Sequence, residues 1–527
     1  MADEKLGTHI DIDSNSSTGK EEVLSHEEIS HVDDDNHHQP RHHTEDEIEA
    51  SGKWYDKKRF GLRYSDAMIQ VVMCAFVIFL TPGMFNALSG IGASISDVAT
   101  SDNAMVALYS TFATVGFFGG TICNTIGIRA SLVFGGIGYC IYSGSLLCFY
   151  HTQNKGFVIF AGAFLGICAS VLWAAQGTII MSYPTEGTKG RALMVFWVIF
   201  NLGAVIGSII PLADNIHNRG STANDGTYIA FIVLMFFGSV VACFMLPMSR
   251  VWKADGTRVT AQKHPNWWLE LKGLFLLLIK EPIVVLMFPM FLSSNWFYTY
   301  QFNDFNAGRF DLPTRSLNSL LYWLSQMIGA VLFGFILDMP WVKRSTRAKI
   351  GWGVVFVLGM VIWGGGYKFQ DFTRADVTVP DDAPKGTEPL LSPINYKQGR
   401  YIGPMFLYMF YGGFDAIYQT FILWVLGALS NNPKKTALYA GFFKGLQSAG
   451  AAIAWRLDAL HHPYMTMFAT SWGLSIGSMV IAIPLIFFRI KDTTDFDDDG
   501  MADLVGQDEL EPKFSTQVSH IDDSNKV

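Results

Sequence analysis

Charged residues are scarce in this sequence: they make up 16% of its 527 residues, whereas hydrophobic residues make up 50%. A soluble domain carries roughly 25% charged residues, so the composition argues against a soluble globular protein. The acidic residues are concentrated near the two ends, so the formal net charge of −8 describes those ends and not the body of the chain. The body of the chain is therefore expected to lie in a membrane.

Signatures of catalysis and redox chemistry are also missing. None of the six cysteines forms a CxxC pair, and all lie in apolar stretches, which favours small buried residues over reactive thiols or metal ligands. The sequence has no Walker-type glycine loop and no recognisable nucleophile paired with a base. We therefore expect no enzyme, no nucleotide-driven motor, no cofactor, no metal site and no nucleic-acid partner.

Twelve long apolar stretches are present instead, separated by short loops. A helix crossing a bilayer core of roughly 30 Å needs about 20 mainly apolar residues, because lipid offers no partner for an unpaired backbone amide. The predicted spans are 66–88, 105–125, 128–150, 156–181, 192–213, 227–248, 282–300, 317–337, 350–367, 401–429, 437–455 and 465–488. The chain is therefore predicted to be an all-α, multi-pass integral membrane protein in a lipid bilayer.

Basic residues gather in alternate connections. They precede the first span, fill the loop between the sixth and seventh, and follow the eighth: Lys53, Lys57, Lys58, Arg59, Arg63; Arg250, Lys253, Arg258, Lys263, Lys272; Lys343, Arg344, Arg347, Lys349. Lys and Arg are enriched on the cytosolic side of membrane proteins. Both termini are therefore predicted to be cytosolic, in the plasma membrane or an endomembrane.

The two ends differ from the body in composition. Residues 1–63 are rich in Asp, Glu, Ser and His, and 491–527 are also acidic, so neither end can bury enough apolar surface to offset the entropy of folding. Both are predicted to be disordered tails. Between them we expect a six-helix bundle over 64–248, a linker over 249–280 and a second six-helix bundle over 281–490.

An internal repeat supports this division. Without a gap, the fourth and fifth spans align with the tenth and eleventh: Gln176 with Gln419, Ile179 with Ile422, Arg191 with Lys434, Phe196 with Tyr439, Phe200 with Phe443 and Gly207 with Gly450. The loop after the second span, with Gly120, Asn124 and Arg129, also matches the loop after the eighth, with Gly334, Asp338 and Arg344. Parallel repeats of this kind are typical of two-bundle transporters.

With these motifs the chain resembles the major facilitator superfamily. Gly120, Asn124, Gly127 and Arg129 resemble its signature loop, with Asn124 in place of the usual acid, and Gly334, Asp338 and Arg344 resemble the second copy. The runs Trp173-Ala-Ala-Gln176-Gly177, Asn295-Trp296-Phe297-Tyr298 and Tyr411-Gly412-Gly413-Phe414-Asp415, with Asp255-Gly256-Thr257 in the linker, resemble the fungal form of its uncoordinated-93-like branch.

The resemblance implies a fold and two alternative functions. The fold is twelve helices in two pseudo-repeats, with the signature loops taking part in gating. One function is alternating-access transport of an unknown small solute or ion. The other is a non-transporting regulator or trafficking partner of a channel or receptor, because animal members of the branch are associated with such roles. A membrane-protein partner is expected only for the second.

Two charges lie well inside predicted spans, away from the span ends. A charge at the centre of a spanning helix costs on the order of 3 kcal/mol on insertion scales, so it usually faces a cavity or a partner. Asp415 lies near the middle of the tenth span with Gln419 on the same face, and Lys444 lies in the eleventh beside Gln447. They are interpreted either as an acid and a base that bind solute or exchange protons, or as a structural ion pair.

Uncharged polar residues extend the candidate lining of a central cavity. They are Gln70, Asn86, Gln176, Asn201, Asn295, Tyr298, Gln301, Tyr322 and Gln326. Such side chains also commonly hydrogen-bond a neighbouring helix. Thr81-Pro82-Gly83 in the first span is predicted to be a hinge, because proline removes a helix hydrogen bond and glycine tolerates the bend.

Overall fold

The helices of the computed structural model include most of the predicted spans. The structure describes residues 43–92, 97–185, 188–215, 224–259, 267–379, 389–429 and 433–492. In these residues ten helices, from Ala67–Gly90 to Tyr464–Arg489, are long and apolar enough to cross a membrane. The predicted spans 105–125 and 437–455 fall on helices outside those ten, α4 with α5 and α17, which carry more polar residues.

Helices of the first half surround one hydrophobic core. They are α2 (Ala67–Ile78), α3 (Met84–Gly90), α4 (Val98–Val115), α5 (Gly119–Ile126), α6 (Ile128–Thr152), α7 (Lys155–Ser182), α8 (Lys189–Asn215) and α9 (Asp225–Cys243). Helix α6 packs on α7 and α9, α4 packs on α7, and α2 packs on α8 and α9. The core consists almost entirely of residues from this half of the chain.

The second half has a core of its own. Its helices are α11 (Phe288–Ser293), α12 (Phe297–Thr299), α13 (Leu312–Leu337), α14 (Arg344–Phe369), α16 (Ile402–Leu429), α17 (Pro433–Ala459) and α18 (Tyr464–Ile481). A 3₁₀ segment (Pro282–Met287) precedes α11 and a π-helical segment (Tyr300–Ala307) follows α12, and together the four form one span, Pro282–Ala307. A π-helical turn (Leu485–Arg489) follows α18. Helix α13 packs on α16, α11 packs on α17 and α18, and α14 packs on α16 and α18.

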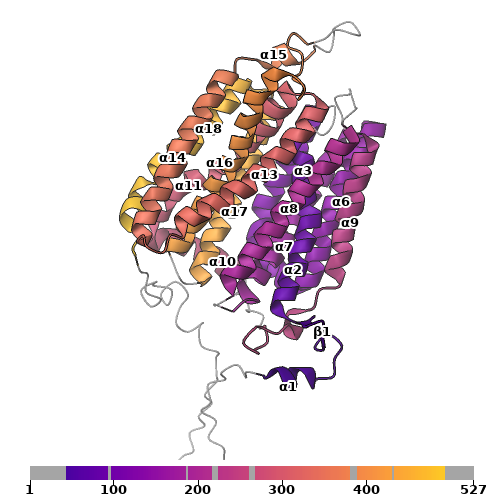
Figure 1. Ribbon diagram of the computed structural model, residues 1–527, viewed down its shortest axis with the longest axis vertical. Coiled ribbons are helices and arrows are strands. Elements are labelled where there is room, and N and C mark those ends of the chain that lie inside the picture. The colour runs from indigo at the N-terminus through magenta and orange to yellow at the C-terminus, as the bar shows by residue number, and fades with distance from the viewer. Residues whose placement is uncertain are drawn as a thin grey trace, which may run out of the picture. The chain divides into compact units, whose positions relative to one another are not determined.

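The two halves meet mainly at two pairs of helices, α4 with α17 and α8 with α13. Figure 1 shows the early helices, indigo to magenta, beside the later ones, orange to yellow. The hydroxyl groups of Ser208 on α8 and Ser319 on α13 lie 3.1 Å apart, and Arg456 on α17 donates a hydrogen bond of 2.8 Å to Asn103 on α4. Polar contacts therefore fasten both pairs.

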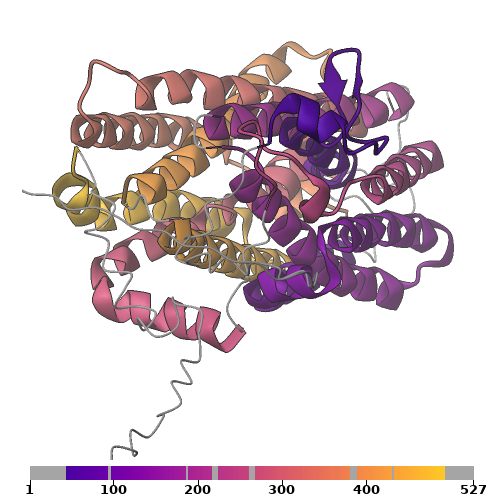
Figure 2. The same cartoon turned by 90° about the horizontal axis from the view of Figure 1, so that it is seen from below.

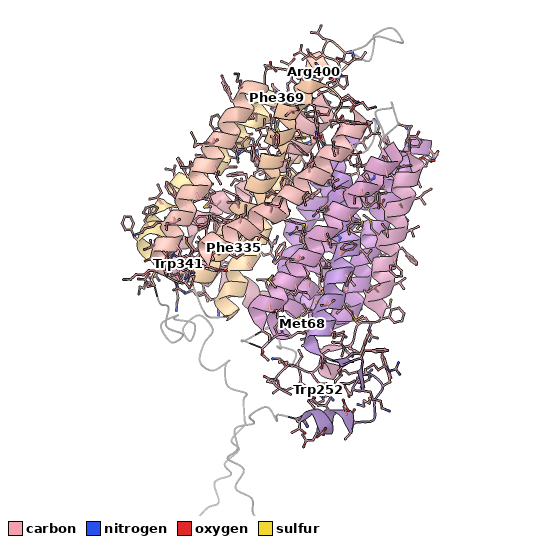
Figure 3. All side chains as sticks on the ribbon, viewed as in Figure 1. Met68, Trp252, Phe335, Trp341, Phe369 and Arg400 are labelled. Carbon is pink, nitrogen blue, oxygen red and sulfur yellow. The ribbon has the colours of Figure 1, made fainter. Side chains whose placement is uncertain are left out.

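The basic segments gather at one end of the helices. Figure 3 places Met68, Trp252 and Trp341 toward this end and Phe369 and Arg400 toward the other. The segment before α2, the linker around Trp252 and the turn before α14 therefore share an end, as the charge pattern requires. That this end faces the cytosol stays a prediction.

The prediction of disorder over 1–63 is wrong for the last part of that range. Residues Glu45–Glu49 form α1, capped by Thr44, while Lys58–Arg59 (β1) and Leu62–Arg63 (β2) form a hairpin. The buried carboxylate of Asp56 accepts hydrogen bonds from Ser65 Oγ at 2.7 Å and from Trp252 Nε1 at 3.1 Å. The segment folds because the linker supplies the apolar partner that it lacks.

Figure 2, seen from below, shows these indigo elements over the ends of the first-half helices. A hydrogen bond from Lys58 to Glu45 holds the pKa of that carboxyl below its usual value. The rest of both predicted tails, 1–42 and 493–527, lies outside the described residues. In the linker, Trp267–Lys280 forms helix α10.

The predicted hinge in the first span coincides with an irregular turn. Residues Phe79–Gly83 form a π-helical segment between α2 and α3, in which the hydroxyl of Thr81 donates to the Val77 carbonyl at 2.6 Å. Proline within a helix leaves a carbonyl without its amide partner, and local π geometry with a Thr hydroxyl compensates for it. A role of this turn as a hinge stays a prediction.

Gly92 provides a sharp test of the contact between the halves. It follows α3 with φ +66°, and a Cβ added there would lie 1.9 Å from the Phe302 carbonyl oxygen of the second half. We expect Gly92→Ala to lower the free energy of unfolding by about 2–4 kcal/mol, from backbone strain together with overpacking. Denaturant unfolding of the purified protein measures this loss.

The matched control is Gly364→Ala on α14, where no atom lies within 4 Å of the added Cβ. This control should change the free energy of unfolding by less than about 1 kcal/mol. Equal stability of both variants would contradict the close contact at Gly92.

Candidate functional site

Asp415 lies near the middle of α16, and its side chain is completely buried. Its carboxylate accepts four hydrogen bonds: from the Tyr298 hydroxyl at 2.7 Å, the Tyr322 hydroxyl at 3.2 Å, Gln326 Nε2 at 2.5 Å and Gln419 Nε2 at 2.6 Å. The donors come from α12, α13 and α16. A charged carboxylate with this many donors is well stabilised in an apolar region.

Helical spacing explains why these groups converge. Asp415 and Gln419 are four residues apart on α16, as are Tyr322 and Gln326 on α13, so each pair lies on one face of its helix. Glycine lets the two faces approach: a Cβ at Gly412 would lie 2.4 Å from the Tyr322 carbonyl oxygen. The close packing of α13 on α16 therefore brings the donors within reach of the carboxylate.

A chain of amides connects Asp415 to Lys444. Lys444 Nζ donates to Gln447 Oε1 at 2.9 Å, and Gln447 Nε2 donates to Gln419 Oε1 at 3.1 Å and to Ser294 Oγ at 3.0 Å. Within the described part of the chain, no salt bridge joins Lys444 directly to Asp415. Two amides therefore separate the charges, and a structural role of the two residues as a pair stays a prediction.

Lys444 lies between the two halves. Its ammonium is 5.7 Å from the ring centre of Trp173 on α7 and 5.2 Å from that of Phe443, yet the side chain remains exposed. An ammonium partway along a 27-residue helix stays hydrated only beside an open space. The exposure of Lys444 thus indicates an accessible polar region between α7 and α17.

The other predicted lining residues separate into three groups. Gln301 joins the network, because its Oε1 accepts from the Tyr322 hydroxyl at 2.8 Å. Gln70 does not: its Nε2 donates to the Tyr64 carbonyl and its Oε1 accepts from the Leu246 amide, so it fastens α2 to the segment after α9. The third group is half-buried and makes no side-chain hydrogen bond within the described ranges: Asn86, Gln176, Asn201 and Asn295.

The signature loops contact the backbone instead of forming a buried acid clamp. Arg129 Nε donates to the Met245 carbonyl at 2.6 Å, and Arg347 donates to the Leu337 carbonyl at 2.7 Å. Arg344 Nε donates to the Lys491 carbonyl at 2.8 Å, while Asp338 ends α13 and is exposed.

The glycines of these loops play different parts. Gly120 begins α5 together with Gly119, and nothing is described of the Asn124 side chain. An added Cβ at Gly334 would meet no atom within 4 Å, so close helix packing does not require glycine there. The gating role of these loops stays a prediction.

Sequence reasoning missed a buried acidic group at the opposite end from the basic segments. Asp102, Asp304 and Asp458 lie outside the predicted spans, which begin at residue 105 and end at residues 300 and 455. The helical segments extend farther, from Val98 to Val115, through Ala307 and through Ala459. The available signal was an acidic residue within five positions of three different span ends, all on one predicted side.

An apolar groove of about 440 Å³ lies between α14 and α18, away from Asp415. Its lining includes Met360, Phe468, Trp472 and Ile476. These side chains are almost entirely apolar, so the Asp415 network remains the better candidate site for a polar solute.

Comparisons with known proteins agree with the fold and indicate the family. The family profile described as "Ion channel regulatory protein UNC-93" matches residues 100–487. A UNC93-like protein of Schizosaccharomyces pombe is 50% identical over 455 residues, covering 85% of this chain and 88% of that protein. UNC93-like protein 1 of Arabidopsis thaliana is 37% identical over 440 residues, covering 82% of this chain and 93% of that protein.

Solved structures are similar in fold only. A peptide transporter crystallised in complex with alafosfalin aligns with a TM-score of 0.54 and 15% identity, covering 85% of this chain and 99% of the transporter. Its fold is that of the major facilitator transporters. Together with the profile match and the relatives' identity, these findings lead to one assignment. The chain belongs to the UNC-93 family.

Proposed function

We propose that this integral membrane protein is a proton-coupled secondary transporter that moves a small solute by alternating access. The observation that supports it most is the Asp415 network: a fully buried carboxylate, held by four donors, connects through two amides to an exposed ammonium between the halves. The network includes eight of the residues expected to line a site, among them the two charges expected well inside the spans.

The packing of the helices supports a two-bundle arrangement with twelve spans, over 64–248 and 281–490. Each major contact in one half has a counterpart in the other: α4 with α7 corresponds to α13 with α16, and α6 with α9 corresponds to α14 with α18. The two helix pairs that join the halves, α4 with α17 and α13 with α8, also correspond to each other when each helix is replaced by its counterpart in the other half. Bundles related in this way can rock about their shared interface.

The chemistry of the network is suited to proton coupling. The ionised Asp415 carboxylate can accept all four donors, but a protonated carboxyl must donate at one oxygen and therefore loses an acceptor position. Protonation would thus rearrange Tyr298, Gln419 and the amides leading to Lys444. The exposed ammonium of Lys444 is suited to an anionic group on the solute.

A second function is favoured by one observation, the profile's description as an ion-channel regulatory family. On that alternative the chain would bind a channel or another membrane protein without moving a solute. The family and the fold are those of membrane transporters and regulators, so both functions fit them.

Reconstitution of the purified full-length chain in liposomes distinguishes the two. With an imposed pH gradient and a mixture of small metabolites outside, we expect at least one metabolite to accumulate inside above its external concentration, as measured by mass spectrometry. Collapse of the gradient with a protonophore is the control. No accumulation, together with stable co-purification of another membrane protein, would overturn transport and favour the regulator.

A further inference from the structure

Three aspartates from both halves of the chain meet at the end of the helices opposite the basic segments. Asp102 is on α4, Asp304 is in the π-helical segment Tyr300–Ala307, and Asp458 is on α17. All three side chains are completely buried. They lie where α4 packs on α17, so they are part of the contact between the halves.

Two side chains hold this cluster together. Asn303 Nδ2 donates to Asp102 Oδ1 and to Asp458 Oδ2, both at 2.8 Å. Arg374, in the short helix α15 (Arg374–Val377), places Nη2 2.5 Å from Asp458 Oδ1 and 3.6 Å from Asp304 Oδ1. One amide and one guanidinium are therefore the hydrogen-bonding and ion-pairing partners of three carboxyl groups.

The hydrogen-bond donors of Asn303 and Arg374 leave several carboxyl oxygens of the cluster without a partner. Both oxygens of Asp304 and Oδ2 of Asp102 are buried and have no hydrogen-bond partner among the described residues. If all three groups were ionised, the cluster would carry a net charge of about −2 out of contact with water. An uncompensated buried charge costs several kcal/mol, and a carboxyl group avoids this cost by binding a proton.

Arg374 makes the only salt bridges to the cluster within the described chain. The titratable side chains that face the cluster are Tyr142 of α6, Tyr300 of the π-helical segment and Tyr464 of α18. The Arg374 guanidinium stacks 4.5 Å from the Tyr464 ring centre, and Arg456 is engaged with Asn103. Tyrosine hydroxyls can donate hydrogen bonds but carry no positive charge.

We propose that Asp102, Asp304 and Asp458 form a proton-binding site that couples protonation to contact between the two halves at this end. This inference deepens the proposed function and rests on it only for the direction of a transport cycle. In contact, the three carboxyl groups hold two protons and pair with Arg374, so the buried cluster is neutral. On separation each O–H bond releases its proton to water, and the carboxylates become hydrated.

The expected result follows from linkage. If separation releases protons, raising the pH favours the separated form by about tenfold per pH unit for each proton released. The limiting slope for this site is therefore two protons. Asp304→Asn fixes one carboxyl group in a neutral form, so it should reduce the slope by one proton and favour contact at high pH.

The experiment measures the distance between the halves directly. Thr152 and Lys397 are exposed, one in each half at this end, and each is replaced by cysteine for spin labelling in a full-length chain without its native cysteines. Distance distributions are recorded in nanodiscs from about pH 5 to about pH 9. Asp371→Asn is the matched control, because Asp371 is an exposed carboxylate before α15.

We expect the separated population to rise with pH in the parent and in Asp371→Asn, with a smaller slope in Asp304→Asn. Asp102→Asn repeats the test if Asp304→Asn fails to fold. A population independent of pH, an unchanged slope in both neutral variants, or a dependence on Na⁺ or Ca²⁺ without one on pH would overturn the proposal. A pH-dependent distance without liposome flux would keep this site while the transport function fails.

Discussion

Asp415→Asn is expected to abolish accumulation of solute against its gradient while exchange and downhill flux continue. The amide keeps the shape of the carboxyl group but cannot bind and release a proton, so coupling is lost and the pathway is kept. In liposomes with a pH gradient, the internal concentration of the solute should fall to its external value. Counterflow with labelled solute measures the exchange that remains.

The same change has a cost in stability that must be measured beside flux. The amide nitrogen introduced by Asp415→Asn would face donors where a carboxylate oxygen accepted them, so we expect a loss of about 1–3 kcal/mol. Asp371→Asn, outside the site, should preserve both stability and accumulation. Undiminished uphill accumulation in Asp415→Asn would refute its role in coupling.

Lys444→Gln tests whether Lys444 and Asp415 stabilise the fold as a pair of opposite charges. Because two amides lie between Lys444 and Asp415, each charge has its own partners and neither is stranded by loss of the other. The stability losses of the two single variants should therefore add in the double variant to within about 0.5 kcal/mol. Substantial recovery of stability in the double variant would support the ion-pair interpretation.

Arg374→Gln is expected to cause the largest loss of stability, about 3–5 kcal/mol, because it removes the cation from a buried cluster of carboxyl groups. Arg374 is 2.5 Å from Asp458 Oδ1, and the Asp458 side chain is completely buried. The loss of stability should grow as the pH rises. At higher pH the buried carboxyl groups either ionise without a cation beside them or stay protonated at a greater cost in free energy. Denaturant unfolding across pH measures it.

A second substitution that restores stability distinguishes this electrostatic effect from a loss of packing. The double variant Arg374→Gln with Asp458→Asn should recover much of the stability, because it removes both members of the pair. Arg400→Gln is the matched control: Arg400 is an exposed arginine at the same end, which donates to Gln398. An equal loss in Arg400→Gln, or no recovery in the double variant, would contradict the expected charge imbalance.

The helices could be predicted because long apolar runs have few alternatives in a bilayer. The ends of those helices were harder, because polar residues there look like solvated loops. Asp304 and Asp458 lie beyond the predicted spans, yet the helical segments continue through Ala307 and Ala459. Their partners, Asn303 and Arg374, are distant in sequence from at least one of the groups that they bind, so no local pattern indicated burial.

The Asp415 network was partly predictable for a similar reason. Helical spacing places Asp415 with Gln419 on one face, and an internal charge needs partners. The sequence could not show that Lys444 and Asp415 are separated by amides, since that depends on how α16 and α17 are rotated. Gln70 was misassigned because an amide that caps a loop and one that lines a cavity look alike in sequence.

The contact between Asp56 and Trp252 also sets an order for biosynthesis. The two residues are 196 positions apart, and Tyr64 donates to the Phe244 carbonyl across 180 positions. At about 5–20 residues per second, a ribosome needs roughly 10–40 seconds to synthesise the chain between Asp56 and Trp252. The N-terminal segment therefore cannot close on the linker until α2 to α9 have been made.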